Sequence, residues 1–356
     1  MILSDLLKKE NNNIDIFRLI AASMVIYGHA YALSPEAGKS DIIHRVLLHD
    51  DYSGSIAVKI FFFLSGLVVT NSLINNGDLI RFVISRVFRI WPALILSSVI
   101  TAVLLGPLLT QLTIVDYFNS NDVLRYIYNI TSMNIQYTLP GVFVDNPYPN
   151  AVNGSLWTIP FEVFAYVLLF AFFAVGVLRS KKLSVAIFIL ILIEPFLTYK
   201  VMFPWVPQNH EIDFLAPCFA FGAILALYKD TVNVRLSHCV GFFVLYYVLS
   251  GTLYSAYLAY AFIFLSILYL SSRKFMLKIK PKIDLSYGVY LWGFPVQQVM
   301  AHYFHSQGVL FNQVSSLLIC LSLGFLSWQL CEKHFIKYGW SLHVFIKEKC
   351  QFLKSN

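Results

Sequence analysis

Residues 14–33 read IDIFRLIAASMVIYGHAYAL, and this stretch decides the fold class. A helix needs about 20 mostly apolar residues to cross the hydrocarbon core of a bilayer, and this stretch has that length and character. Within it, Arg18 and His29 are basic or ionisable near neutral pH. No small-residue cleavage site follows, so we expect the stretch to stay in the protein as its first membrane-spanning helix.

The composition of the whole chain agrees with a membrane protein. Of its 356 residues, 58% are hydrophobic and 13% are charged, and the mean hydropathy is +0.68. A soluble domain carries roughly 25% charged residues, so this chain cannot cover a water-soluble globule with polar surface. The net charge of +7 is explained by basic cytoplasmic loops, and no nucleic-acid partner is predicted.

Similar apolar segments recur along the chain and predict an all-α, polytopic bundle of about ten transmembrane helices. The predicted spans are 14–33, 55–75, 88–108, 157–178, 183–199, 212–228, 237–251, 254–271, 284–303 and 311–331. We expect one transmembrane domain over residues 1–340 and a short polar cytoplasmic tail over 341–356. The longest connection, 109–156, is expected to be an outer loop.

The basic residues indicate how the chain is oriented. With the N-terminus inside, most of the 26 Lys and Arg residues fall on inner segments, and only Lys39, Arg45, Arg125 and Lys200 fall on outer ones. Positive residues are enriched on the cytoplasmic side of membrane proteins. The distribution therefore predicts an even number of spans and two cytoplasmic termini.

Four ionisable side chains fall within or near predicted spans, namely Arg18, His29, Lys59 and Glu162. Such residues are costly in lipid and commonly mark a functional site. Arg18 and His29 are about three helical turns apart, so they share a face and are separated by roughly 16 Å. Arg18 is expected toward the cytoplasm and His29 toward the outside.

His29 and Glu162 are expected at similar depths from the outer face, which suggests a general base and the carboxylate that orients it. The pKa of histidine lies near neutral pH, as a base acting on a hydroxyl group requires. Two alternatives remain open. His29 can be a hydrogen-bonded histidine inside the bundle, and Glu162 can pair with a buried cation such as Lys59.

Arg86 and Arg89 are spaced i, i+3 near the cytoplasmic end of a predicted span. Neighbouring guanidinium groups suit a phosphate-rich ligand, although spacing alone favours the enrichment of positive residues on the inner side as the explanation. The sequence has no phosphate-binding loop, no nucleophile elbow and no zinc-ligand spacing, so no metal site is predicted.

Six short motifs complete the pattern. They are Ile14-Asp15-Ile16-Phe17-Arg18 with His29, Phe61 to Gly66, Arg86-Val-Phe-Arg89-Ile-Trp-Pro92, Asn153-Gly-Ser-Leu-Trp157 with Glu162, Ser286-Tyr287-Gly288-Val-Tyr290-Leu-Trp292, and Glu332-Lys333-His334-Phe335. Together and in this order they resemble the acyltransferase-3 family, bacterial inner-membrane enzymes that O-acylate polysaccharides, lipopolysaccharide and related sugars. Two positions depart from the family pattern: Gly293 stands where His is frequent, and His334 where Pro is frequent.

The resemblance implies a role for each site residue. Acyl-CoA, most commonly acetyl-CoA, would be a cytoplasmic co-substrate, and no cofactor would be bound permanently. The residues implied are His29 and Glu162 for catalysis, Arg18, Arg86 and Arg89 for acyl-CoA binding, and Asn153, Trp157, Ser286, Tyr287 and Tyr290 for acceptor binding or motif structure. His29 would act as base or carry the acyl group transiently.

The sequence therefore predicts a multi-pass O-acetyltransferase of the bacterial inner membrane that acts on a cell-surface or lipid-linked sugar. Its expected partners are membrane lipid, acyl-CoA and a glycan or lipid-linked oligosaccharide. A homo-oligomer is compatible with the sequence. The alternative is a transporter or flippase without chemistry, which would use the same ionisable residues as a substrate or proton path.

Overall fold

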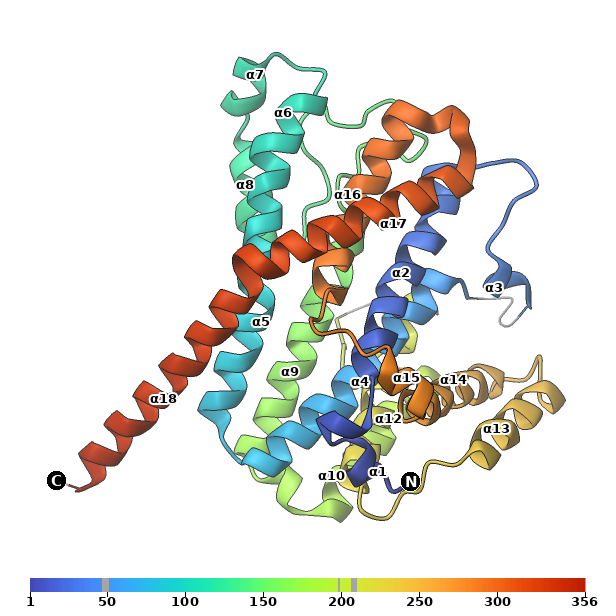
Figure 1. Cartoon of the computed structure of the whole chain (residues 1–356), viewed down its shortest axis with the longest axis vertical. Helices are drawn as coiled ribbons and strands as arrows, with labels where there is room; N and C mark the ends of the chain where they lie inside the picture. Colours follow the sequence, from blue (N-terminus) through green and yellow to red (C-terminus); the bar gives the residue numbers. More distant parts are fainter. Residues whose placement is uncertain (47–50, 198, 206–209, 356) are drawn as a thin grey trace. The chain divides into compact units, whose positions relative to one another are not determined.

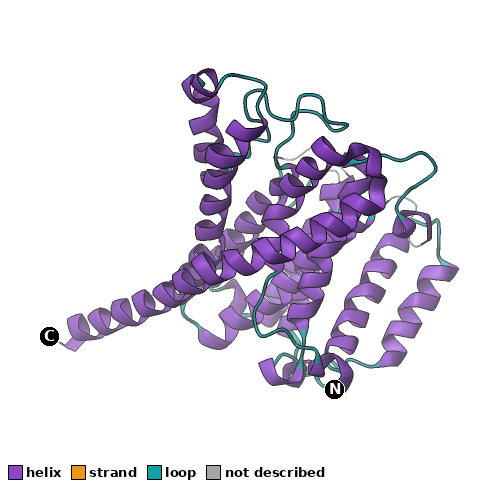
Figure 2. Ribbon diagram, turned by 45° about the horizontal axis from the view of Figure 1, so that its top comes forward, coloured by secondary structure: helices purple, strands orange, loops and turns teal. Residues whose placement is uncertain are grey.

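The structure is a computed structural model, and it describes residues 1–46, 51–197, 199–205 and 210–355. The described residues form helices, turns and three isolated β-bridges, without a strand (Figure 2). The prediction of an all-α chain is confirmed. Residues 198 and 356, within the predicted span 183–199 and the predicted tail, lie outside the described residues.

Each of the ten predicted spans overlaps a helix, although the bounds differ, most at α5, which begins nine residues before the predicted span 88–108. These helices are α2 (Ile14–Leu33), α4 (Ser53–Asn76), α5 (Leu79–Ile100), α9 (Ile159–Ala174), α10 (Lys181–Leu192), α12 (Leu215–Leu227), α13 (Leu236–Val248), α14 (Ser255–Ser271), α16 (Ser286–Phe304) and α17 (Gly308–Ser327). The short helices elsewhere are α1 (Leu3–Leu6), η1 (Lys9–Asn11), α3 (Ile42–Val46), η4 (Val177–Arg179), η5 (Glu194–Phe196), α11 (His210–Asp213), α15 (Lys274–Lys278) and η6 (His305–Gln307).

Length and composition limit how many of these helices can cross a membrane alone. Among the described residues, five helical segments are long and apolar enough, namely Ile14–Leu33, Ser53–Asn76, Leu79–Leu109, Gly154–Ala174 and Ser286–Cys350. The helices α13 and α14 are apolar but shorter. The membrane character is thus supported, while the number of ten spans and the cytoplasmic position of both termini stay predictions.

The chain forms two compact units, which are described separately. Unit 1 comprises Met1–Val25, Ser40–Asn76 and Ala171–Asp284, and unit 2 comprises Ile26–Lys39, Gly77–Phe170 and Leu285–Asn356. The helices α2 and α9 are each divided between the two units. In unit 1, α13 and α14 lie side by side, and α4 packs on α12 (Figure 1).

Two glycines allow α4 and α12 to approach each other closely in unit 1. A Cβ atom on Gly66 would lie 2.1 Å from the carbonyl oxygen of Phe219, and one on Gly222 would lie 2.2 Å from that of Phe63. Small residues let membrane helices bring their backbones together. Gly66, the last residue of the Phe61 to Gly66 motif, therefore serves the packing of α4 on α12.

We expect Gly66→Ala to destabilise the protein by about 1–3 kcal/mol, because the added methyl group collides with backbone that a rotamer change cannot move. The measurement is the thermal unfolding midpoint of the detergent-solubilised protein. Gly241→Ala on α13 is the matched control, since its Cβ meets no atom within 4 Å. Equal midpoints for the two variants would contradict the packing role.

Unit 2 is built around α5, α16 and α17. The side chain of Asp78 caps α5 by accepting a hydrogen bond from the Arg81 amide at 2.9 Å. The helix then continues through the π-helical segment η2 (Thr101–Leu105) into α6 (Gly106–Leu109). The helix α17 likewise continues through a second π-helical segment, η7 (Trp328–Glu332), into α18 (Lys333–Ser355).

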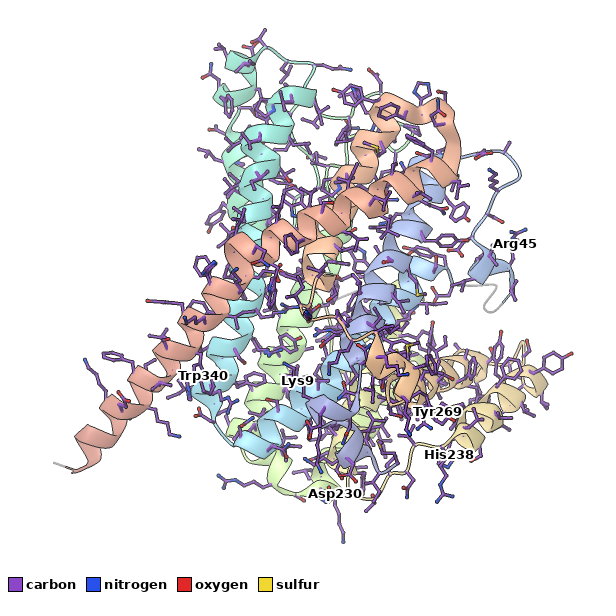
Figure 3. The ribbon with its side chains drawn as sticks, viewed as in Figure 1. Lys9, Arg45, Asp230, His238, Tyr269 and Trp340 are labelled. Atoms are coloured by element: carbon purple, nitrogen blue, oxygen red, sulfur yellow. The ribbon has the colours of Figure 1, made fainter. Side chains whose placement is uncertain are left out.

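The predicted polar tail is part of α18 and is helical up to Ser355. This helix packs on α5, where His343 Nε2 lies 2.8 Å from Asp78 Oδ2. Trp340, labelled on α18 in Figure 3, places its ring 5.0 Å from the guanidinium carbon of Arg81.

The connection 109–156 is not a plain loop as expected. It contains α7 (Ile114–Asn119) and α8 (Asn121–Thr131), which lie near α6 in Figure 1. Each has a side-chain cap, because Thr113 accepts from the Asp116 amide and Ser120 from the Asp122 amide. Such caps stabilise short helices, which a search for membrane-length apolar runs does not find.

Candidate active site

His29 lies near the C-terminal end of α2, in the part of that helix that belongs to unit 2. Its Nδ1 is 3.5 Å from the Ser155 hydroxyl oxygen, and its ring meets the edge of Phe294 at a centroid distance of 5.5 Å. Ser155 and Phe294 are buried. Polar contacts at catalytic sites are often this long before substrate binds. The imidazole is thus held beside a hydroxyl group within a candidate membrane span.

Ser155 sits on the short helix η3 (Gly154–Thr158), and two of the predicted residues hold this helix against α16. The Asn153 side chain caps η3 and donates a hydrogen bond to the Leu291 carbonyl at 3.0 Å. The Tyr290 hydroxyl lies 2.5 Å from Thr158 Oγ1 and donates to the Ser155 carbonyl oxygen. In this structure Asn153 and Tyr290 therefore position the turn that carries Ser155.

Glu162 is in the first turn of α9, and its carboxylate accepts a hydrogen bond from the Tyr166 hydroxyl at 2.5 Å. It is also close enough to interact electrostatically with Tyr287 and Tyr290. The role expected of Glu162 was to orient His29. The Tyr166 contact lies one turn further along the same helix, and the expected role of Glu162 stays a prediction.

The predicted donor-binding arginines have aromatic and acidic neighbours. The Arg86 guanidinium lies 5.6 Å from the centre of the Tyr166 ring, and that of Arg89 lies 5.7 Å from the Tyr287 ring. Arg89 Nη1 also pairs with Glu332 Oε2 at 3.2 Å, where the carboxylate side chain is only 2% exposed. Part of the Arg89 charge therefore serves to neutralise a buried carboxylate, and its binding of phosphate stays a prediction.

Further hydrogen bonds hold the residues that contact these arginines. The Tyr287 hydroxyl donates to the Ile90 carbonyl at 2.9 Å, and Ser327 donates to the other oxygen of Glu332 at 2.9 Å. The π-helical segment η7 brings Glu332 to this position at the end of α17. Unit 2 thus carries polar groups from His29 and Ser155, through Tyr290, Glu162 and Tyr166, to Arg86 and Arg89.

Arg18 belongs to a different unit from the residues described above. It belongs to unit 1, where its Nη1 lies 3.6 Å from Asp284 Oδ2. Among the described residues its buried Nε has no hydrogen-bond partner. The prediction that Arg18 binds the donor is therefore neither supported nor opposed by contacts to the other site residues.

Lys59 does not need Glu162 as a partner. Its ammonium group lies 2.7 Å from both Asp51 Oδ2 and Ser55 Oγ in unit 1, and Tyr260 donates to the same Asp51 oxygen. The ion pair is almost completely buried, with side-chain exposures of 0% and 3%. The interpretation of Lys59 as the partner of Glu162 is thereby replaced by a pair within unit 1.

Three further positions complete the predicted set. Ser286 is buried in the first turn of α16, and the Trp157 ring meets that of Phe161 at 5.8 Å. At Gly293, where the family often has His, a Cβ atom would lie 3.1 Å from a side-chain carbon of Ile26. A larger residue at this position would require the Ile26 side chain to shift.

The contacts of Ser155, Thr158, Tyr166 and Glu332 were missed by the motif analysis. Ser155 and Glu332 stand inside the motifs, Thr158 directly follows the motif residue Trp157, and Tyr166 is four residues after Glu162, so a signal existed for each. The signal did not say which helices would meet. Within the described part of the chain, no group of three His, Cys, Asp or Glu side chains is arranged to hold a metal ion.

Comparison with known proteins matches residues 11–331 to the acyltransferase-3 family, described as an acyltransferase domain. The chain is 31% identical over 342 residues to a protein named O-acetyl transferase from Shigella phage Sf6, covering 92% of this chain and 96% of that protein. It is 27% identical over 172 residues to Nodulation protein 10 of Rhizobium leguminosarum bv. viciae, covering 44% and 43%. No solved structure matches.

Proposed function

The chain belongs to the acyltransferase-3 family and is an O-acetyltransferase, and we propose that it moves the acetyl group of cytoplasmic acetyl-CoA to a sugar hydroxyl group. The proposed acceptor is a cell-surface or lipid-linked glycan. The observation that carries the proposal is His29, an imidazole beside the Ser155 hydroxyl within a candidate membrane span. The similarity to a named O-acetyl transferase over nearly the whole length of both chains supports the reaction class.

In the proposed step His29 removes the proton from the acceptor hydroxyl as the sugar oxygen attacks the thioester carbonyl carbon. The new C–O bond forms as the C–S bond breaks, and the leaving CoA thiolate takes the proton from the imidazolium. A positioned general base of this kind typically contributes about 10²–10⁴ in rate. Glu162 is proposed to stabilise the positive charge that His29 gains.

The donor is proposed to bind at Arg86 and Arg89. Guanidinium groups bind phosphate oxygens in pairs, and CoA carries a diphosphate and a further phosphate. Both arginines lie in the first half of α5, on the side that the positive residues mark as cytoplasmic. Stacking on Tyr166 and Tyr287 restricts the two side chains, which lowers the entropy lost when a ligand binds.

The proposed location is the bacterial inner membrane, with about ten spans and both termini in the cytoplasm. The ten apolar helical segments and the concentration of Lys and Arg on alternate connections support this topology. It places the donor site toward the cytoplasm and His29 toward the opposite face.

The test is acetyl transfer by the purified full chain in nanodiscs. The protein is incubated with acetyl-CoA labelled in the acetyl group and with a glycan extract of the membrane. We expect label to enter glycan and free CoA to appear in equal amounts. If neither product appears with several acyl-CoA donors and acceptor extracts, the proposal fails and a transport function without chemistry becomes the better explanation.

A further inference from the structure

Unit 2 contains an apolar groove that the proposed reaction does not use. Its volume is about 430 Å³, within the usual range for ligand sites. The walls come from three helical stretches within two candidate membrane segments, Leu79–Leu109 and Ser286–Cys350. The lining residues are Leu96, Ile100 and Leu105 of the first, Trp292, Pro295, Val296, Val299 and Met300 of α16, and Ile319, Leu323, Leu326, Ser327 and Leu330 of α17 and η7. The lining is almost entirely hydrocarbon, with Ser327 as its polar residue.

The groove is formed where these three helices are irregular. Leu105 belongs to the π-helical segment η2, and Leu330 belongs to the π-helical segment η7. The third wall contains Pro295, a proline inside α16 that removes a helix hydrogen bond. Interruptions of this kind cost helix stability and are frequent at functional sites. Their coincidence on all three walls indicates a built site rather than a packing fault.

The position of the groove relates it to His29 through α16. Phe294, which touches His29, and Tyr290, which holds the turn of Ser155, lie on one face of this helix. At 100° per residue, Pro295, Val296 and Val299 point to the opposite face, and these residues line the groove. A molecule in the groove therefore lies about one helix diameter, roughly 10 Å, from the catalytic histidine.

We infer that this groove binds the hydrocarbon chain of a lipid-linked sugar acceptor and so presents the sugar to His29. The occupant must be a hydrocarbon chain because the walls lie in membrane segments and offer no set of polar groups for a sugar or CoA. A chain seated there would confine the attached sugar near the catalytic wall of α16, which raises its effective concentration. The inference rests on the proposed function and specifies its acceptor class.

The experiment compares two acceptors that differ only in the lipid. One is the lipid-linked glycan fraction of a membrane extract, and the other is the same glycan after mild acid has released it from the lipid. Leu323→Trp fills the groove from α17, and Val299→Trp fills it independently from α16. Leu318→Trp is the matched control, because Leu318 is on α17, outside the groove lining, and 60% exposed.

We expect both groove variants to raise KM for the lipid-linked acceptor about tenfold or more, with acetylation of released glycan unchanged. The Leu318→Trp control should behave as wild type with both acceptors. The inference is overturned if the groove variants keep the wild-type KM for the lipid-linked acceptor, or if they lose activity equally with both acceptors.

A second readout separates this inference from the proposed function. The lipid-linked glycan that co-purifies with each protein is counted by mass spectrometry, without any transfer reaction. Retention by wild type and loss from both groove variants supports the groove even if no acetyl transfer is detected. Equal retention by wild type and both variants overturns the groove, whether or not acetyl transfer occurs.

Discussion

His29→Ala is expected to lower kcat/KM for acetyl transfer by about 10²–10⁴, because the general base is lost while the donor and acceptor sites remain. The side chain touches Ser155 and Phe294, so its removal also leaves a small space in unit 2. His29→Gln keeps much of the volume and a hydrogen-bonding group but cannot act as a base. It should be as inactive as the alanine variant.

The measurement is label transfer in nanodiscs, with the unfolding midpoint recorded for each variant. His305→Ala is the matched control, because this histidine lies on η6 in unit 2 and is exposed. Wild-type rates in a folded His29→Gln variant would remove His29 from the catalytic step. If only His29→Ala loses activity, and its unfolding midpoint falls strongly, the loss would come from disturbed packing.

The pair formed by Arg89 and Glu332 gives the second large effect. Arg89→Ala removes the guanidinium group that pairs with the buried Glu332 carboxylate, and breaking such a pair typically costs about 3–5 kcal/mol. We expect the variant to unfold at a markedly lower temperature and to lose acetyl transfer. The double variant Arg89→Ala/Glu332→Gln should recover most of the stability, since the buried charge is then absent.

The double variant also separates the two roles of Arg89. If Arg89 binds donor phosphates, restored folding should leave KM for acetyl-CoA raised at least about tenfold, the effect of roughly 1.4 kcal/mol of lost binding. Glu332→Gln alone, with Arg89 present, is the control for the loss of the carboxylate. A wild-type KM in the double variant would show that Arg89 is structural and would leave Arg86 as the proposed phosphate ligand.

The sequence did not indicate the short helices or the partners of the buried side chains. Residues 114–131 alternate apolar with polar residues and so form no long apolar run, yet they are helical, with side-chain caps at Thr113 and Ser120. The pairing of Lys59 depends on Asp51, which lies just before α4 and outside its apolar run. A search for apolar segments does not find such polar residues at helix ends.

The sequence by itself determined the membrane class, the position of ten helical segments and the set of motif residues. These properties are local, because hydropathy and helical periodicity act over a few turns of one segment. Only the tertiary structure decided the partners of those residues. Ser155 meets His29 across 126 positions of the chain, Tyr290 meets Thr158 across 132, and Arg89 meets Glu332 across 243. Such pairs depend on which helices pack together and on how π-helical segments turn side chains, and a single sequence carries no direct record of either.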